Sequence, residues 1–115
     1  MLSKKFRLPG NQIPLVLKKG KRFSFPLFNL VVCQQSQLLN SRFTFVVSTK
    51  ISKKAVVRNR TKRLLSEAVR LLLPQIKKGF DIIFFAKKPF LEEKLQDVMP
   101  QVEKALNKIK LLISS

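Results

Sequence analysis

Positively charged side chains gather in one short stretch of this 115-residue chain. Lysine offers a point charge, and arginine offers a planar fork that holds a phosphate by two hydrogen bonds. Asn59 lies among them and can donate to or accept from a ribose or a base edge. The stretch therefore predicts binding to phosphates along a nucleic acid. No acidic residue interrupts its seven cations, which are Lys50, Lys53, Lys54, Arg58, Arg60, Lys62 and Arg63.

The charge of the whole chain supports the same prediction. Its 24 basic and 6 acidic side chains give a formal net charge of +18, and the first carboxylate is Glu67. Charge of one sign destabilises a compact chain unless a partner neutralises it. A polyanion partner is therefore favoured over a merely solvated basic surface. It is also favoured over a membrane surface, because the apolar residues of the basic helix are needed for a core.

Several enzyme classes are excluded by composition. The chain has no His and a single Cys, so it holds no Ser-His-Asp triad, no Cys–His pair, no His-ligated metal and no internal disulfide. Its carboxylates show no pairing. Asp81 opens a predicted strand and is expected to be a structural or a surface residue, and Cys33 is expected to be a buried thiol. The lone thiol and the lack of a secretion signal or membrane span indicate the cytoplasm.

The elements that must position the cations follow from hydropathy patterns. Pro14 fits the first turn of a short helix that Gly20 ends, and Pro74 ends an amphipathic helix whose apolar arc includes Leu71. Pro100 lies either in the first turn of the last helix or inside a longer one. The expected order is a basic extended arm (1–12), helix (13–19), strand (23–33), polar link (34–41), strand (42–49), helix (55–73), central strand (77–89) and C-terminal helix (from 95).

This order indicates an α+β sandwich of one sheet with helices. The short polar link suggests that the strands 23–33 and 42–49 form an antiparallel hairpin. The pattern leaves open whether residues 23–49 hold two strands or three.

The segment AVVRNRTKRLLSEAVR (55–70) resembles the signature helix of the bacterial ribonuclease P protein family, with Arg58-Asn59-Arg60 as its hallmark triplet. Residues 5–22, 43–63 and 79–89 resemble the family's first helix, its strand, loop and helix, and its next strand. The resemblance implies one domain, 1–115, of order α-β-β-β-α-β-α. It also implies a central, mostly antiparallel sheet and a left-handed βαβ crossover, against the usual rule.

The resemblance also implies a function. The chain would be the protein subunit of ribonuclease P, an endonuclease that removes the 5′ leader of precursor tRNA. Its partners would be the catalytic RNA and the leader, with no membrane and no small-molecule substrate. Catalysis and magnesium would belong to the RNA, so the protein would hold no catalytic residue and no metal. The alternatives are a structural RNA-binding protein, such as a ribosomal protein of related fold, and an independent nuclease.

Two sets of site residues follow from the resemblance. The seven cations and Asn59 would face the RNA subunit. A cleft between the first helix and the sheet would guide the single-stranded leader, and two of its positions that are usually aromatic are Ile13 and Leu17 here. The cleft would comprise Ile13, Leu17, Phe28, Val31 and Arg42.

Overall fold

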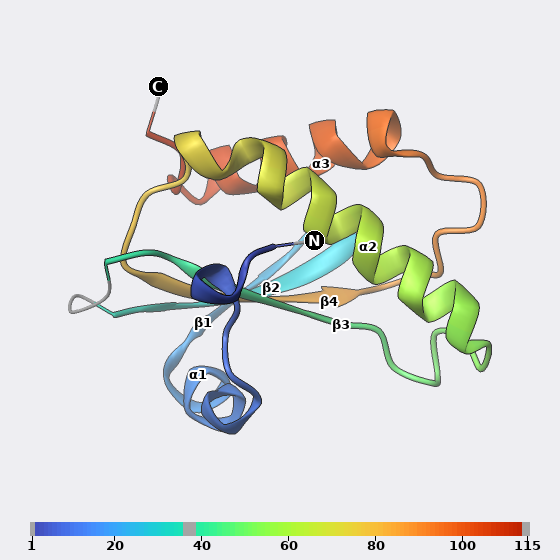
Figure 1. Ribbon diagram of the computed structural model, residues 1–115, viewed down its shortest axis with the longest axis horizontal. Coiled ribbons are helices and arrows are strands. Elements are labelled where there is room, and N and C mark those ends of the chain that lie inside the picture. The colour runs from blue at the N-terminus through green and yellow to red at the C-terminus, as the bar shows by residue number, and fades with distance from the viewer. Residues whose placement is uncertain (1, 36–38, 114–115) are drawn as a thin grey trace.

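A four-stranded sheet organises the computed structural model, which describes residues 2–35 and 39–113 (Figure 1). The strand order is β1-β2-β4-β3; β1 pairs with β2 and β2 with β4 antiparallel, whereas β3 and β4 are parallel. The helix α1 lies under one face, and α2 and α3 lie over the other. The α+β sandwich with a mostly antiparallel sheet is confirmed. The strands are β1 (Lys21–Ser24), β2 (Phe28–Gln34), β3 (Arg42–Val46) and β4 (Phe80–Ala86), and the helices are α1 (Ile13–Lys19), α2 (Ala55–Leu72) and α3 (Leu95–Lys108).

Three strands precede α2. The stretch predicted as one strand over 23–33 is divided at Pro26, and its halves form the β1–β2 hairpin, in which Ser24 pairs with Asn29. The predicted hairpin of 23–33 with 42–49 is wrong, because β4 lies between β2 and β3. The most apolar strand takes the centre, where both of its faces are covered. Residues 36–38 of the polar link lie outside the described residues.

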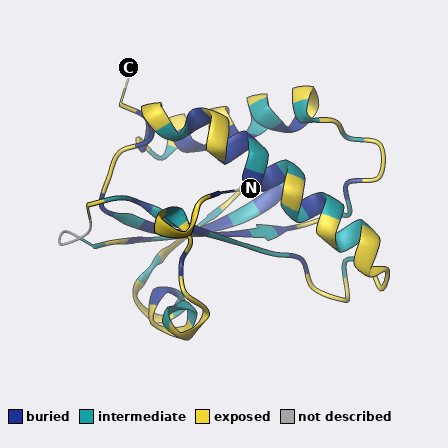
Figure 2. Ribbon diagram, viewed as in Figure 1, coloured by how far each residue is buried: buried dark blue, intermediate teal, exposed yellow. Residues whose placement is uncertain are grey.

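The alternation of side chains along the strands gives each face of the sheet its own core. Phe28, Leu30 and Phe84 belong to the main core under α2 and α3, and Val31 and Ile83 belong to a smaller core against α1. Figure 2 shows the buried residues of the sheet between its two helical layers. The central strand β4 is buried on both faces, as predicted.

The first helix forms and ends as the sequence predicts. Pro14 lies in the first turn, and the N–H of Gly20 donates to the carbonyl of Val16 at 2.7 Å. Gly20 has an ordinary φ of −77°, so its conformational freedom is not the reason for glycine. A Cβ there would lie 2.6 Å from the Val16 oxygen and 2.7 Å from Cγ1 of Val31. The missing side chain lets the end of α1 approach β2.

The long helices differ from prediction in detail. A 3-10 turn that contains Pro74 follows α2, as expected of its end. Leu71, which the spacing places in the apolar arc, is 40% exposed, and Ser66, which the spacing places on the polar side, is buried. The helix α3 packs beside α2 and shifts the buried arc. Pro100 lies inside α3, which begins at Leu95, where the Asp97 carboxylate accepts the Lys94 N–H at 2.9 Å. Of the two alternatives for Pro100, the longer helix is therefore correct.

The N-terminal residues cross the edge of the sheet. We call residues 2–8 the edge strap. Arg7 bridges Phe43 of β3 in parallel, and the Leu8 N–H donates to the Phe43 carbonyl at 2.9 Å. Leu2 is buried in the main core and Leu8 in the smaller one. The expectation of an extended arm missed these two anchors and two 3-10 turns, Lys4–Phe6 and Gly10–Gln12.

The connection from β3 to β4 passes through α2 and joins two parallel neighbours. The left-handed sense expected for it stays a prediction. Within the described residues, none of the helices is both long and apolar enough to cross a membrane.

Candidate nucleic-acid interface

The start of α2 and the loop before it present most of the predicted cations to solvent (Figure 2). Arg58 is half-buried, and its Nη1 donates to the Ser52 carbonyl at 2.9 Å, so its guanidinium is oriented while other N–H donors stay free. Lys62 is also half-buried. In the described part of the chain, none of these side chains pairs with a carboxylate. The exposed members are Lys50, Lys53, Lys54, Asn59 and Arg63.

Arg60 has a different environment from the other members of the cluster. Its Nε donates to the Phe90 carbonyl at 3.2 Å, and its Nη2 donates to the Glu93 carbonyl at 2.9 Å. The neighbouring Thr61 hydroxyl accepts the Phe90 N–H at 3.0 Å and donates to the Val57 carbonyl at 2.9 Å. Arg60 therefore holds the segment that follows β4 against α2. The structure separates it from the cations that are free to meet a phosphate.

One row of residues crosses the α1 face of the sheet. Strand register aligns Ser24, Asn29, Phe85 and Val46, one from each strand. The next row holds Val31 and Ile83, on which α1 packs through Val16 and which α1 therefore covers. The first row borders a groove of about 460 Å³, whose lining residues are Arg22, Phe23, Ser24, Asn29, Leu30, Val31 and Phe85.

The groove lies at the end of the sheet that leads to the basic helix. Val46 is the last residue of β3, and the chain passes from it through residues 47–54 into α2. Phe85, its partner in the row, lies next to the end of β4. Figure 1 shows that β3 and β4 run toward the end of the sheet near which α2 begins. The groove beside Phe85 and the cations of residues 50–63 therefore lie toward the same end of the sheet.

The structure revises the predicted cleft. Ile13 and Leu17 are half-buried and pack against the smaller core together with Phe85, and Val31 is buried beneath α1. Phe28 is fully buried on the opposite face, with its ring 5.2 Å from that of Phe84, so it does not line the groove. Strand alternation places the side chains of Phe28 and Val31 on opposite faces, and of these two residues only Val31 lines the groove.

Sequence reasoning missed Phe85. The run GFDIIFFAKKP was interpreted as a strand buried on both faces, which offered no reason to expect an open aromatic ring in it. The available signal was the alternation from Asp81 through Ile83 to Phe85, which places all three on the α1 face. The half-buried Phe85 supplies the aromatic surface that the aliphatic Ile13 and Leu17 lack.

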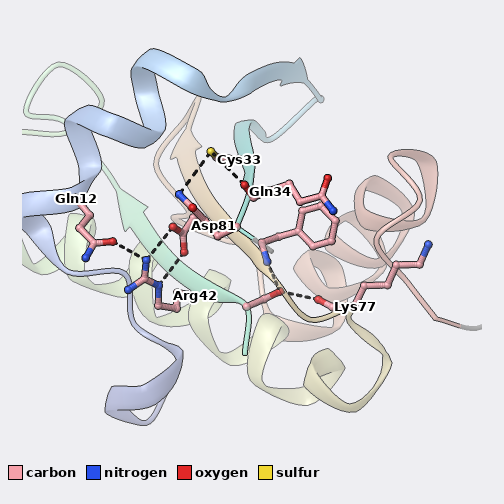
Figure 3. A network of polar contacts seen from close by, with 9 residues as sticks. Gln12, Cys33, Gln34, Arg42, Lys77 and Asp81 are labelled. Atoms are coloured by element: carbon pink, nitrogen blue, oxygen red, sulfur yellow. Dashed lines mark hydrogen bonds and ion pairs between the residues drawn. The ribbon is translucent and has the colours of Figure 1, made fainter. Parts of the chain in front are cut away.

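Arg42 forms a partly buried polar network under the start of α1 (Figure 3). Its Nε and Nη2 donate to the two Asp81 oxygens at 2.8 and 2.9 Å, and Nη2 also donates to the Gln12 side-chain oxygen at 2.5 Å. The hydrogen bond to Asp81 raises the pKa of Arg42 above its ordinary value. Of the two roles expected for Asp81, the structural one is correct and the surface one is wrong, because its side chain is fully buried. Arg42 was expected in the cleft, but its Nε and Nη2 are used to hold Asp81 and Gln12. Cys33, which borders the network, is a buried thiol, as predicted.

Together these features define a class of protein, a basic α+β sandwich with a surface suited to single-stranded and folded RNA. A model of the family described as Ribonuclease P matches residues 2–110. The chain belongs to the bacterial ribonuclease P protein family, and so to the RNA-binding proteins of tRNA processing.

Individual relatives agree with this assignment. The ribonuclease P protein component of Fusobacterium nucleatum is 40% identical over 86 residues, which cover 74% of this chain and 76% of that protein. The component from Alkaliphilus oremlandii is 33% identical over 100 residues, which cover 87% and 86%. These alignments span most of both chains.

Solved structures share the fold. A mutant of the Staphylococcus aureus RNase P protein aligns with a TM-score of 0.83 at 25% identity, over 94% of this chain and 91% of that one. The RNase P protein from Thermotoga maritima aligns with a TM-score of 0.80 at 28% identity, over 90% and 97%. The β1-β2-β4-β3 sheet with its three helices is thus an arrangement that the family shares.

Proposed function

We propose that this chain binds the catalytic RNA of a bacterial, cytoplasmic ribonuclease P and the 5′ leader of precursor tRNA, and so assists removal of the leader. One observation carries the proposal. The groove with Phe85 lies toward the end of the sheet where the chain leaves β3, and the unpaired cations follow in the loop before α2 and in α2 itself. A substrate strand in the groove would there lie close to an RNA bound by the helix.

The cations at the start of α2 would contact the RNA subunit. Arg58 is oriented by Ser52 and keeps free donors, and Asn59 beside it can contact a ribose or base. Each phosphate that they neutralise releases counterions, which makes the affinity dependent on salt. The proposed contacts are Lys50, Lys53, Lys54, Arg58, Asn59, Lys62 and Arg63, and Arg60 is proposed to act through the segment that it holds.

The groove would take the leader. Single strands are gripped by stacking of bases on aromatic rings and by cations along the backbone. Phe85 offers the ring and Arg22 an exposed cation at the rim. Asn29 belongs to the same lining and adds a polar side chain to it. Ile13 and Leu17 would add apolar area from α1.

In this proposal the RNA subunit cuts the phosphodiester bond and holds the magnesium that the reaction uses. The protein contributes a positive surface, which lowers the repulsion between two polyanions and favours substrate binding. The absence of His from the chain fits this division of labour, because the usual general acid–base side chain is missing.

Reconstitution tests the proposal. The chain is mixed with a bacterial ribonuclease P RNA at low magnesium, and release of the leader is measured against the RNA alone. Rescue of cleavage supports the proposed function, and a variant with Arg58→Ala and Lys62→Ala should lose the rescue. RNA binding without rescue would indicate a structural RNA-binding protein, and cleavage without added RNA would indicate a nuclease; either result overturns the proposal.

A further inference from the structure

A second hollow lies at the other edge of the sheet, between the edge strap, β3 and α2. Its volume is about 230 Å³, and it shares no residue with the groove beside Phe85. The function proposed above uses only one of its residues, Lys62, and assigns no ligand to the hollow itself. It is lined by Leu2, Arg7, Leu8, Phe43, Thr44, Phe45, Lys62 and Ser66.

Two cations from different elements line this strap hollow. The Nε of Arg7 donates to the Leu2 carbonyl at 2.8 Å, and its two terminal nitrogens have no partner among the described residues. The ammonium of Lys62 on α2 is likewise unpaired there. The lining contains no carboxylate. A site with two unpaired cations and no acid favours an anion.

An aromatic ring completes the hollow. Phe45 on β3 is half-buried, and its ring lies 5.2 Å from that of Phe84 in the main core. The core therefore supports the Phe45 ring while part of it stays open at the hollow. Cations beside a supported aromatic ring are what proteins use to hold single-stranded nucleic acid, the ring for a base and the cations for a phosphate.

The hollow is built before any ligand arrives. Leu2 is 3% exposed and Leu8 is 5% exposed, so both ends of the strap are anchored in the cores. Backbone pairing with Phe43 fixes Arg7 against β3. A site that is already ordered loses little conformational entropy on binding.

We propose that the strap hollow binds one nucleotide of a single-stranded RNA segment, with the phosphate between Arg7 and Lys62 and the base against Phe45. Lys62 lies one helical turn after Arg58, so the hollow continues the cationic surface of α2 around the edge of the sheet. The proposal concerns a site separate from the leader groove and does not depend on which RNA the chain serves.

An NMR titration of the full chain with an oligouridylate of about five nucleotides tests this site. The amide signals of Phe45, Ser66 and Leu2 should shift and saturate. Lys62→Gln and Phe45→Leu should each weaken the affinity derived from these signals by about fivefold or more. The matched charge control is Lys104→Gln on the exposed face of α3. The matched aromatic control is Phe80→Leu, at a half-buried ring of β4 that lines neither the strap hollow nor the groove. Both should leave that affinity unchanged.

Two outcomes would overturn the proposal. In the first, the shifts are confined to the groove around Asn29 and Phe85. In the second, inorganic phosphate gives the same shifts and Phe45→Leu has no effect, which would reduce the hollow to an anion site. Lys62→Gln keeps the test valid if Phe45→Leu fails to fold. Because no ribonuclease P RNA is present, a failed reconstitution and a failed titration are separate results.

Discussion

Arg42 and Asp81 lie opposite each other in the register of the parallel strands β3 and β4 and form an ion pair with two hydrogen bonds. The Asp81 side chain is fully buried and that of Arg42 is 17% exposed. A buried charge is costly unless it is paired and hydrogen-bonded. Because Arg42 also donates to Gln12, the pair connects the sheet to the turn that begins α1. The position of α1 over its face of the sheet therefore depends on this pair.

Asp81→Ala should destabilise the fold by about 3 kcal/mol, because it leaves Arg42 without a counter-charge in a mostly buried site. Urea unfolding monitored by circular dichroism measures the loss. The double variant with Asp81→Leu and Arg42→Met removes both charges and should lose less than the single variant. Equal losses in the two variants would show that packing, rather than the ion pair, holds this position.

Gly20→Ala should cost about 2 kcal/mol, because the new Cβ would overlap the Val16 oxygen and Cγ1 of Val31. Gly10→Ala is the matched control, since no atom lies within 4 Å of a Cβ at that position. Thermal unfolding of the two variants gives the comparison. A Gly20→Ala variant as stable as Gly10→Ala would contradict the close approach of α1 to β2.

Arg58→Ala should change RNA binding, whereas Arg60→Ala should change the stability of the fold. Arg58→Ala should weaken binding to ribonuclease P RNA and lower the log–log salt slope by about one unit, because one phosphate contact is lost. Arg60→Ala should leave the slope unchanged and lower the free energy of unfolding by about 2 kcal/mol, because two carbonyls lose their donor. Filter binding over a salt series, with Lys104→Ala as the control, measures the slopes. A lowered salt slope for Arg60→Ala would show that Arg60 contacts a phosphate of the RNA.

Aromatic residues on α1 should tighten the hold on the leader. Ile13→Phe and Leu17→Phe add stacking surface beside Phe85, so the affinity for precursor tRNA should rise relative to mature tRNA. Phe85→Leu should have the opposite effect. Affinities of the reconstituted holoenzyme are measured with leaders of several lengths. If leader length makes no difference in any variant, the groove does not bind the leader.

The stability of the fold should fall in acid through two glutamates. The hydrogen bond from Lys88 lowers the pKa of Glu93 below its ordinary value of 4.5, and the one from Arg70 does the same for Glu67. A glutamate whose pKa is lower in the folded protein than in the unfolded chain stabilises the fold. The whole of this stabilisation is present above the unfolded-state pKa, and it is lost as the pH falls through the folded-state pKa. A variant with Glu93→Gln and Glu67→Gln should show a weaker loss between about pH 5 and pH 3. Unfolding at several pH values tests this, and an unchanged pH profile would contradict it.

The sequence predicts this fold well where patterns are local. Helical spacing locates α2, the apolar run identifies β4 as central, and Pro14 and Gly20 bracket α1. The strand neighbours were not predictable, because nothing local in 23–49 shows that a strand from residues 80–86 will enter between β2 and β3. The burial of Leu2 was likewise not predictable, because a single apolar residue in a basic segment forms no pattern.

The candidate site, like the fold, was predictable only where the signal is local in the sequence. Charge alone located the cations, since an acid-free run is visible in the sequence. The different environment of Arg60 was not visible, because its partners Phe90 and Glu93 are about thirty residues away, at sequence separations of 30 and 33. Phe28 was assigned to the cleft by position in the family, although its face of β2 belongs to the main core. Phe85 became evident only once the register was known.

The place of β4 between β2 and β3 also sets the order in which the chain can fold as it is synthesised. The β1–β2 hairpin is local and can form early, but β3 has no neighbouring strand until residues 80–86 have left the ribosome. Until then the exposed sides of β2 and β3 are unpaired, and the cations of residues 50–63 are already available. A nascent chain that ends before Phe80 therefore exposes its cations before the sheet that positions them is complete. Early contact with RNA is then a hazard during synthesis, although the finished protein binds RNA.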